Sequence, residues 1–215
     1  MVGVVYATRR EAGPLLSVMS AVPHARRPFL TFQGAADRGT PCIVVVSGMG
    51  KVAATAAAAH LVTVHGVAML VSAGLCGRLT PDLRWSVGDL FRISTAVEGD
   101  CDRFGRAEPP VSCDAGWFGR LAPARLVTCD RPVFDAAQRS RLSGIGDLVD
   151  MEGAAVARVA GLYGIGCAMV KGISDAADEK GRRELGRNID RVSERIARFL
   201  APELSTTRNS ESHEI

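Results

Sequence analysis

The sequence contains few aromatic residues: phenylalanine, tyrosine and tryptophan together make up 5% of its 215 residues. So few rings argue against a surface that stacks the bases of single-stranded nucleic acid. An excess of charge of one sign is also missing, because 26 basic and 23 acidic residues give a formal net charge of only +3. This balance gives no reason to expect a nucleic-acid or membrane-surface partner.

Long apolar runs are absent too. No run approaches the roughly 18 residues that a membrane span needs, and the first residues do not form a signal peptide. The six cysteines include no C-x-x-C pair, and several lie in apolar segments such as "PCIVVV" and "IGCAMV", where cysteine behaves as a small hydrophobic residue. These features predict a soluble protein of the reducing cytoplasm.

Common cofactor and nucleophile motifs are missing. The turn "SGMGKVAAT" has Val45 where a phosphate-binding loop needs glycine. The segment "GLYGIG" does not match G-x-G-x-x-G, and no G-x-S-x-G occurs. The histidines His24, His60, His65 and His213 are scattered along the chain without metal-ligand spacing. We therefore expect neither a metal nor an organic cofactor.

What the sequence does contain is an alternation of short apolar strands and helices. Strands are predicted in "VGVVYA", "PCIVVVSG", "VAMLVSAG", "VGDLFRISTAV", "ARLVTCD" and "GIGCAMVKGISD". Helices are predicted over 8–19, 49–66, 134–144 and 152–163, with an amphipathic closing helix through Leu185, Ile189, Val192, Ile196 and Phe199.

This alternation predicts an α/β fold, a three-layer sandwich around a twisted, mainly parallel mixed sheet. Residues 1–203 form a single domain, and the polar tail 204–215 is expected to be disordered. Residues 98–120, which have glycine, proline and aspartate throughout, are expected to form a long functional loop.

Several residues follow directly on predicted strands: Glu11, Leu75, Asp130 and Asp175. Ligands of such sheets bind outside the carboxyl ends of the strands. Taken singly, Glu11, Asp175 and the helix-starting Glu152 could be surface or capping residues. Because buried carboxylates are costly unless they bind something, the three acids together indicate a site for a polar ligand.

Five motifs give the chain a resemblance that runs nearly end to end. They are "VGVVYATRREA", "SGMGKVAAT", "SAGLCGRL" followed by "VGDL", "VDMEGAAVARVA" and "VKGISDAAD". With them the chain resembles the nucleoside phosphorylase and nucleosidase superfamily, in particular the 5'-methylthioadenosine/S-adenosylhomocysteine nucleosidases. The resemblance implies a purine nucleoside phosphorylase-like fold and cleavage of an N-glycosidic bond.

The resemblance also implies roles for the acids. Asp175 matches the general acid that protonates the leaving purine, so burial should raise its pKa, and Ser174 would orient it. Glu152 matches the residue that accepts hydrogen bonds from the ribose hydroxyls, and Met151 the residue that packs on the sugar. Glu11 matches the base that positions and deprotonates water.

The resemblance implies roles for other residues as well. Gly74 and Leu75 belong to the glycine turn beside the sugar and the nucleophile. Phe104 stands where the family places an aromatic residue that often reaches the 5' pocket of a neighbouring subunit, and a homodimer is expected. Pro132 and Val133 would contact the base.

Two further positions depart from the common pattern of the family. Phe134 is a further candidate for contact with the base, and Lys171 stands where an arginine is common.

The choice of nucleophile rests on charge. The superfamily's phosphorylases bind phosphate with arginines, where this chain has Glu11 and Ser72, and with a serine, where it has Leu75. An acid and an apolar residue at these positions favour water over phosphate.

Three arginines keep the phosphorylase alternative open. Arg9, Arg10 or Arg78 would have to bind phosphate in another geometry. The segment "DRPVF" and the motif "VDME" also resemble the hopanoid-associated phosphorylase subgroup, which makes adenosylhopane a candidate substrate.

The sequence thus predicts a purine nucleosidase that releases adenine from a 5'-modified adenosine of the methylthioadenosine or adenosylhomocysteine type. Its alternatives are a phosphate-dependent phosphorylase, a futalosine-type hydrolase and a non-catalytic nucleoside-binding protein.

Overall fold

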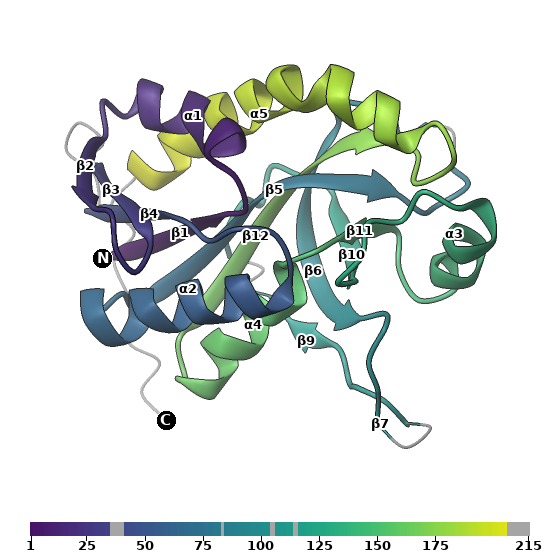
Figure 1. The fold of residues 1–215 in the computed structure, drawn as a ribbon, viewed down its shortest axis with the longest axis horizontal. Helices are drawn as coiled ribbons and strands as arrows, with labels where there is room; N and C mark the ends of the chain where they lie inside the picture. The colour runs from purple at the N-terminus through teal and green to yellow at the C-terminus, as the bar shows by residue number, and fades with distance from the viewer. Residues whose placement is uncertain (35–40, 83, 104–105, 114–115, 206–215) are drawn as a thin grey trace.

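The computed structural model describes residues 1–34, 41–82, 84–103, 106–113 and 116–205. They form a mixed sheet with helices on both faces (Figure 1). Helices α1 (Arg9–Val18) and α5 (Gly181–Ser205) pack on one face, and α2 (Lys51–His65) and α4 (Gly153–Leu162) pack on the other. The predicted α/β fold with three layers is confirmed.

The strand order is β11-β10-β6-β12-β5-β1-β4-β3-β2, with the short β9 on β6. The long strands are β1 (Val2–Tyr6), β4 (Cys42–Val46), β5 (Met69–Arg78), β6 (Leu90–Glu98), β10 (Pro123–Thr128) and β12 (Gly166–Asp175). Strands β4, β1, β5 and β12 run parallel, whereas β6 is antiparallel to β12.

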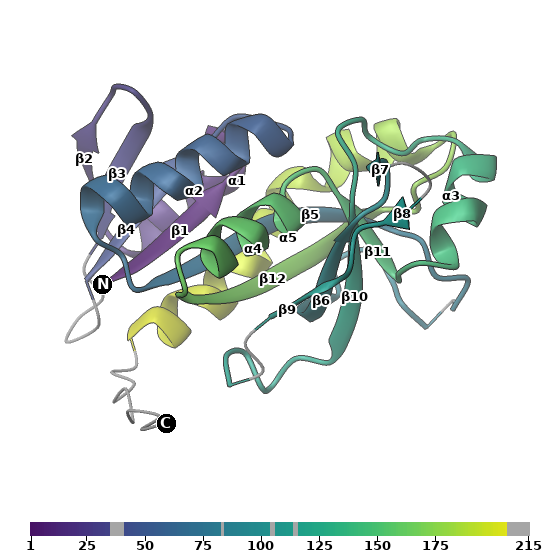
Figure 2. The same ribbon diagram turned by 90° about the horizontal axis from the view of Figure 1, so that it is seen from below.

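A short strand, β11 (Leu148–Asp150), closes part of the sheet into a ring. It pairs in parallel with β10 and antiparallel with β5, so that β5, β12, β6, β10 and β11 form a closed circuit of neighbours. Figure 2 shows how strongly this half of the sheet curves compared with the half that holds β1 and β4. The ring brings the end of β11 to the same side as the end of β12.

The central strand β5 is buried on both faces, and its side chains alternate between two cores. Leu70 and Cys76 belong to the core beneath α2 and α4, whereas Val71 and Ala73 belong to the core beneath α1 and α5. Strands buried on both sides read as continuous apolar runs, which explains why the sequence revealed them. A third, smaller core lies near α3 (Ala136–Ser143).

Several strands were not predicted. The antiparallel hairpin of β2 (Val22–Ala25) and β3 (Leu30–Gly34) forms one edge of the sheet. Strand β2 is mostly exposed and contains Pro23, so it carries no buried apolar run. The segment 98–120 is not wholly irregular, because it contains the two-residue strands β7 (Asp102–Arg103), β8 (Arg106–Ala107) and β9 (Val111–Ser112).

The closing helix is longer than predicted. Helix α5 continues through Pro202 to Ser205, so the predicted tail begins too early. The reason is packing: Leu204 is buried in the core beneath α1 and α5, and this burial offsets the helix bond that proline cannot make. Residues 206–215 lie outside the described ranges, and their disorder stays a prediction. None of the helices in the described ranges is long and apolar enough to cross a membrane.

Gly172 provides a test of the contact between α5 and the sheet. A Cβ atom added at Gly172 would lie 2.4 Å from Val192 Cγ1, so Gly172→Ala must push the helix away. We expect a loss of about 1–3 kcal/mol in the free energy of unfolding, measured by urea denaturation. The matched control is Gly186→Ala in α5, where nothing lies within 4 Å of the added atom. The control should gain up to about 1 kcal/mol, and equal effects at both sites would contradict this packing.

Candidate active site

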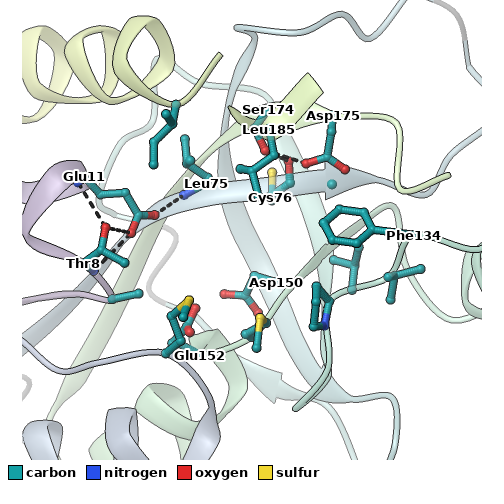
Figure 3. A pocket seen from close by; sticks show the side chains of 18 residues that line it. Thr8, Glu11, Leu75, Cys76, Phe134, Asp150, Glu152, Ser174, Asp175 and Leu185 are labelled. Atoms are coloured by element: carbon teal, nitrogen blue, oxygen red, sulfur yellow. Dashed lines mark hydrogen bonds between the residues drawn. The ribbon is translucent and has the colours of Figure 1, made fainter. Parts of the chain in front are cut away.

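A cavity of about 160 Å³ opens where α1 begins, β12 ends and β11 passes into α4. Figure 3 shows the side chains that line it. Glu11, Glu152 and Asp175, which lie far apart in the sequence, all contribute to its wall. The predicted convergence of three acids on one pocket is therefore present in the structure.

Glu11 is held by the chain that begins α1. Thr8 is the N-cap of this helix, and Glu11 is its third residue, so the two residues form a capping box. Glu11 Oε2 accepts hydrogen bonds from Thr8 Oγ1 at 2.6 Å and from Thr8 N at 3.1 Å. Glu11 Oε1 accepts one from Leu75 N at 3.3 Å. Glu11 is thus a buried carboxylate and not the solvated helix residue that a surface interpretation would require.

Glu152 occupies the N-cap position of α4, yet its side chain makes no capping bond there. Its Oε1 instead accepts a hydrogen bond from Gly50 N at 2.8 Å. Gly50 has a φ of +93°, a backbone conformation that favours glycine, and it lies in the turn "SGMGKVAAT". This turn therefore holds a carboxylate rather than a phosphate.

A buried ion pair lies directly behind Glu152. Lys171 Nζ lies 2.8 Å from Asp150 Oδ2, and the two side chains are 3% and 1% exposed. Asp150 also accepts hydrogen bonds from Thr128 Oγ1 at 2.6 Å and from Gly153 N at 2.8 Å. Burial and the negative charge of Asp150 raise the pKa of Glu152 to about 7, although Lys171 opposes the shift.

Asp175 is the last residue of β12 and is buried. Its Oδ2 accepts a hydrogen bond from Ser174 Oγ at 2.7 Å, and its Oδ1 accepts one from Ala177 N at 2.9 Å. Burial raises the pKa of Asp175 to about 6, and these two hydrogen bonds limit the shift. A Cβ atom added at Gly77 would lie 3.1 Å from Asp175 Oδ1, so this glycine leaves room for the carboxyl group.

The remaining predicted site residues fall into two groups. Met151, Leu75, Ser174, Pro132 and Val133 line the cavity, as does Phe134. Leu75 lies inside β5 rather than after it, because the strand continues to Arg78.

Gly74 and Lys171 do not line the cavity. An atom added at Gly74 would lie 3.2 Å from Glu11 Oε1 and 3.8 Å from Lys171 Nζ, so Gly74 makes room for both groups. Phe104 lies outside the described residues. Asp130, which follows β10, accepts a hydrogen bond from Lys51 N at 3.0 Å and so binds the start of α2 instead of the cavity.

Sequence reasoning missed several lining residues, among them Thr8, Met49, Asp150, Leu185 and Ile189. Thr8 had a usable signal, because T-x-x-E before an apolar run is the pattern of a capping box. Leu185 and Ile189 were read only as the apolar stripe of α5. Nothing in their spacing separates the residues that face a cavity from those that face a sheet.

The described lining includes no arginine, lysine or histidine. The three arginines considered for phosphate binding have other contacts. Arg10 Nε pairs with Asp190 Oδ1 at 2.7 Å, Arg78 Nη1 donates to Trp85 O at 2.6 Å, and Arg9 stacks over Phe32 at 4.4 Å from the ring centroid. Within the described part of the chain, the cavity therefore presents carboxyl groups and no cationic side chain.

Three histidines are less scattered than the sequence suggested. The ring centroids of His24 and His65 lie 5.3 Å apart, and those of His60 and His65 lie 5.1 Å apart. Even so, within the part of the chain that the structure describes, no group of three or more histidine, cysteine, aspartate or glutamate residues could hold a metal ion.

The chain is similar in sequence to known nucleosidases. The aminodeoxyfutalosine nucleosidase of Helicobacter pylori (strain J99 / ATCC 700824) is 26% identical over 223 residues, which cover 93% of this chain and 96% of that protein. The 5'-methylthioadenosine/S-adenosylhomocysteine nucleosidase of Treponema pallidum (strain Nichols) is 25% identical, with coverage of 93% and 89%.

Among solved structures, the futalosine hydrolase of Helicobacter pylori strain 26695 has the same fold, with a TM-score of 0.84 at 21% identity and coverage of 94% and 96%. The sequence model of the phosphorylase superfamily matches residues 1–203. Since that match spans nearly the whole chain, the chain belongs to the phosphorylase superfamily.

Proposed function

We propose that this chain is a nucleosidase that hydrolyses the N-glycosidic bond of a 5'-modified adenosine and releases adenine. The observation that carries the proposal is one cavity lined by Glu11, Glu152 and Asp175, with no cation among its described lining residues. Three acids suit a reaction that protonates a base, holds a sugar and activates water. The names of the relatives, which are nucleosidases, support it.

Asp175 is the general acid in this proposal. Departure of a purine is easier when its N7 is protonated, so the acid must carry a proton near neutral pH. A pKa raised to about 6 by burial keeps a useful fraction of Asp175 protonated there. Ser174 orients the carboxyl group through its 2.7 Å hydrogen bond. Phe134 lies on the same side of the cavity as Asp175 (Figure 3), and with Pro132 and Val133 of the lining it supplies the apolar contact for the base.

Glu152 and Met151 hold the ribose, and Glu11 receives a proton from the attacking water. Gly50 N occupies only one oxygen of Glu152, which leaves the other free to accept a ribose hydroxyl. Lys171 acts behind the cavity as the partner of Asp150 rather than as a contact of the substrate.

The 5' group is the least constrained part of the substrate. Once the base, ribose and water positions are assigned, the lining side chains that remain include Met49, Leu75, Leu185 and Ile189, which are all apolar. They favour an uncharged 5' substituent such as an alkylthio group. The name of the Helicobacter pylori relative keeps aminodeoxyfutalosine as the second candidate.

We further propose that the chain forms a homodimer. Helix α2 carries apolar residues on all sides, and such a helix usually has a partner on each of them. Val52 on α2 and Leu162 on α4 are each 81% exposed, and the two helices pack together on the same face. Met49 links this face to the cavity, because it is exposed and also lines the pocket. The cytoplasmic location stays a prediction, with which the six free thiols are compatible.

The choice of water over phosphate is tested by product analysis. Methylthioadenosine, adenosylhomocysteine and aminodeoxyfutalosine are each incubated with the protein, with and without phosphate, and the products are identified. We expect free adenine and a free sugar at the same rate in both conditions, because no described lining residue could pair with an anion. A sugar 1-phosphate that forms only with phosphate would establish the phosphorylase instead.

The role of Asp175 is tested by Asp175→Asn. Loss of a general acid should lower kcat for a nucleoside by about 10²–10⁴-fold, while the Kd of a bound nucleoside changes little. The control substrate is a 4-nitrophenyl 5-methylthioriboside, whose leaving group departs without a proton. If the variant cleaved the nucleoside at the wild-type rate, Asp175 would not be the acid. Binding without any wild-type turnover would indicate a non-catalytic nucleoside-binding protein.

The pH dependence follows from the same group. Asp175 acts in its protonated form, and its raised pKa is about 6, so kcat/KM for a nucleoside should fall as the pH rises above about 6. The 4-nitrophenyl riboside should lack this limb because it needs no proton. An identical basic limb for both substrates would assign the titration to another group.

A further inference from the structure

The two carboxylate oxygens of Glu11 accept different sets of hydrogen bonds. Oε2 accepts two short bonds, from the hydroxyl and the backbone N–H of Thr8, at 2.6 and 3.1 Å. Oε1 accepts a single long bond, from Leu75 N at 3.3 Å. One carboxylate oxygen is therefore saturated by donors, whereas the other keeps a lone pair available.

The second oxygen, Oε1, has room because residue 74 is a glycine. Oε1 lies 3.2 Å from the position that a Cβ atom of Gly74 would occupy, and Gly74 has none. Glu11 and Thr8 both line the cavity, and Figure 3 shows the two side chains turned toward each other, with the Leu75 bond on the cavity side. In this arrangement Oε2 is turned toward Thr8, whereas Oε1 is on the cavity side.

We propose that Thr8 is a positioning residue that fixes Glu11 so that Oε1, and not Oε2, takes the proton of the attacking water. The inference rests on the proposed hydrolysis. As the bond between C1' and the purine breaks, its electron pair stays with the base, which receives the proton of Asp175. The water oxygen bonds to C1', and its proton passes to Glu11 Oε1.

A purely structural role for Thr8 must be separated from this one. The Thr8 hydroxyl also accepts a hydrogen bond from Glu11 N at 3.2 Å, which caps the first turn of α1. Glycine is about as good an N-cap residue as threonine, whereas valine is a poor one. Glycine has no hydroxyl and no charge, so Thr8→Gly largely keeps the cap and removes the donor to Glu11.

The experiment compares Thr8→Gly, Thr8→Ser and Thr8→Val with the wild-type chain, using methylthioadenosine as substrate. We expect Thr8→Gly and Thr8→Val to lower kcat at least tenfold with KM within about twofold, because a misplaced base affects the chemical step. Thr8→Ser, which keeps the hydroxyl, should retain kcat. Thermal unfolding should show a clearly lower Tm for Thr8→Val than for Thr8→Gly.

The matched control is Arg10→Gln, which removes the exposed ion pair between α1 and Asp190 without touching Glu11. It should leave kcat unchanged. If Thr8→Gly kept wild-type kcat, or if kcat followed Tm across all the variants, Thr8 would be only a helix cap. If the wild-type chain cleaved none of the nucleosides tested for the proposed function, that function would fail first, which is a separate outcome.

Discussion

The buried ion pair between Lys171 and Asp150 is the contact on which the site depends. Lys171 comes from β12 and Asp150 from β11, and Asp150 is also bound by Thr128 of β10 and by the first residue of α4. One carboxylate thus joins three strands and a helix at the point where the sheet closes into a ring. Met151 and Glu152 follow Asp150 directly, so their positions are fixed by this junction. Removing one partner of such a pair leaves an unpaired charge in the interior, which typically lowers the free energy of unfolding by several kcal/mol.

The positive charge of Lys171 in the same pair reduces the electrostatic repulsion among the acids that line the cavity. Asp175 has no such cation beside it, and burial raises its pKa from 3.8 to about 6. The folded chain therefore holds this proton more tightly than the unfolded chain, and stability is lost as the pH rises from about 4 to about 6. The loss is about 3 kcal/mol by the usual conversion of a pKa shift. Asp175, the group proposed to protonate the purine, therefore lowers the stability of the fold. Such a cost is expected of a functional acid rather than of a structural one.

The sequence revealed the parts of the fold that carry strong local signals. The strands β1, β4, β5 and β12 are continuous apolar runs, and α5 shows a regular apolar stripe. The hairpin of β2 and β3 was missed because its edge strand buries little, and β11 because three residues form no pattern. The acids could be placed near one another because the strand ends of a parallel sheet share an edge. The contact between Lys171 and Asp150 could not be predicted, since it depends on the pairing of β11 with β10 and β5 that closes the ring.

Each acid of the cavity lies where the chain changes from strand to helix or turn. Glu11 is in the first turn of α1, Glu152 is the N-cap of α4, and Asp175 ends β12. At such junctions backbone N–H groups lack partners within a helix or sheet and can bind a carboxylate instead. Thr8 N, Gly50 N and Ala177 N do so here for Glu11, Glu152 and Asp175. Each of these N–H groups binds one oxygen of a carboxyl group, and the second oxygen of each acid has a different environment. The fold thereby orients three acids with main-chain atoms, and the hydroxyl groups of Thr8 and Ser174 add the shortest hydrogen bonds to two of them.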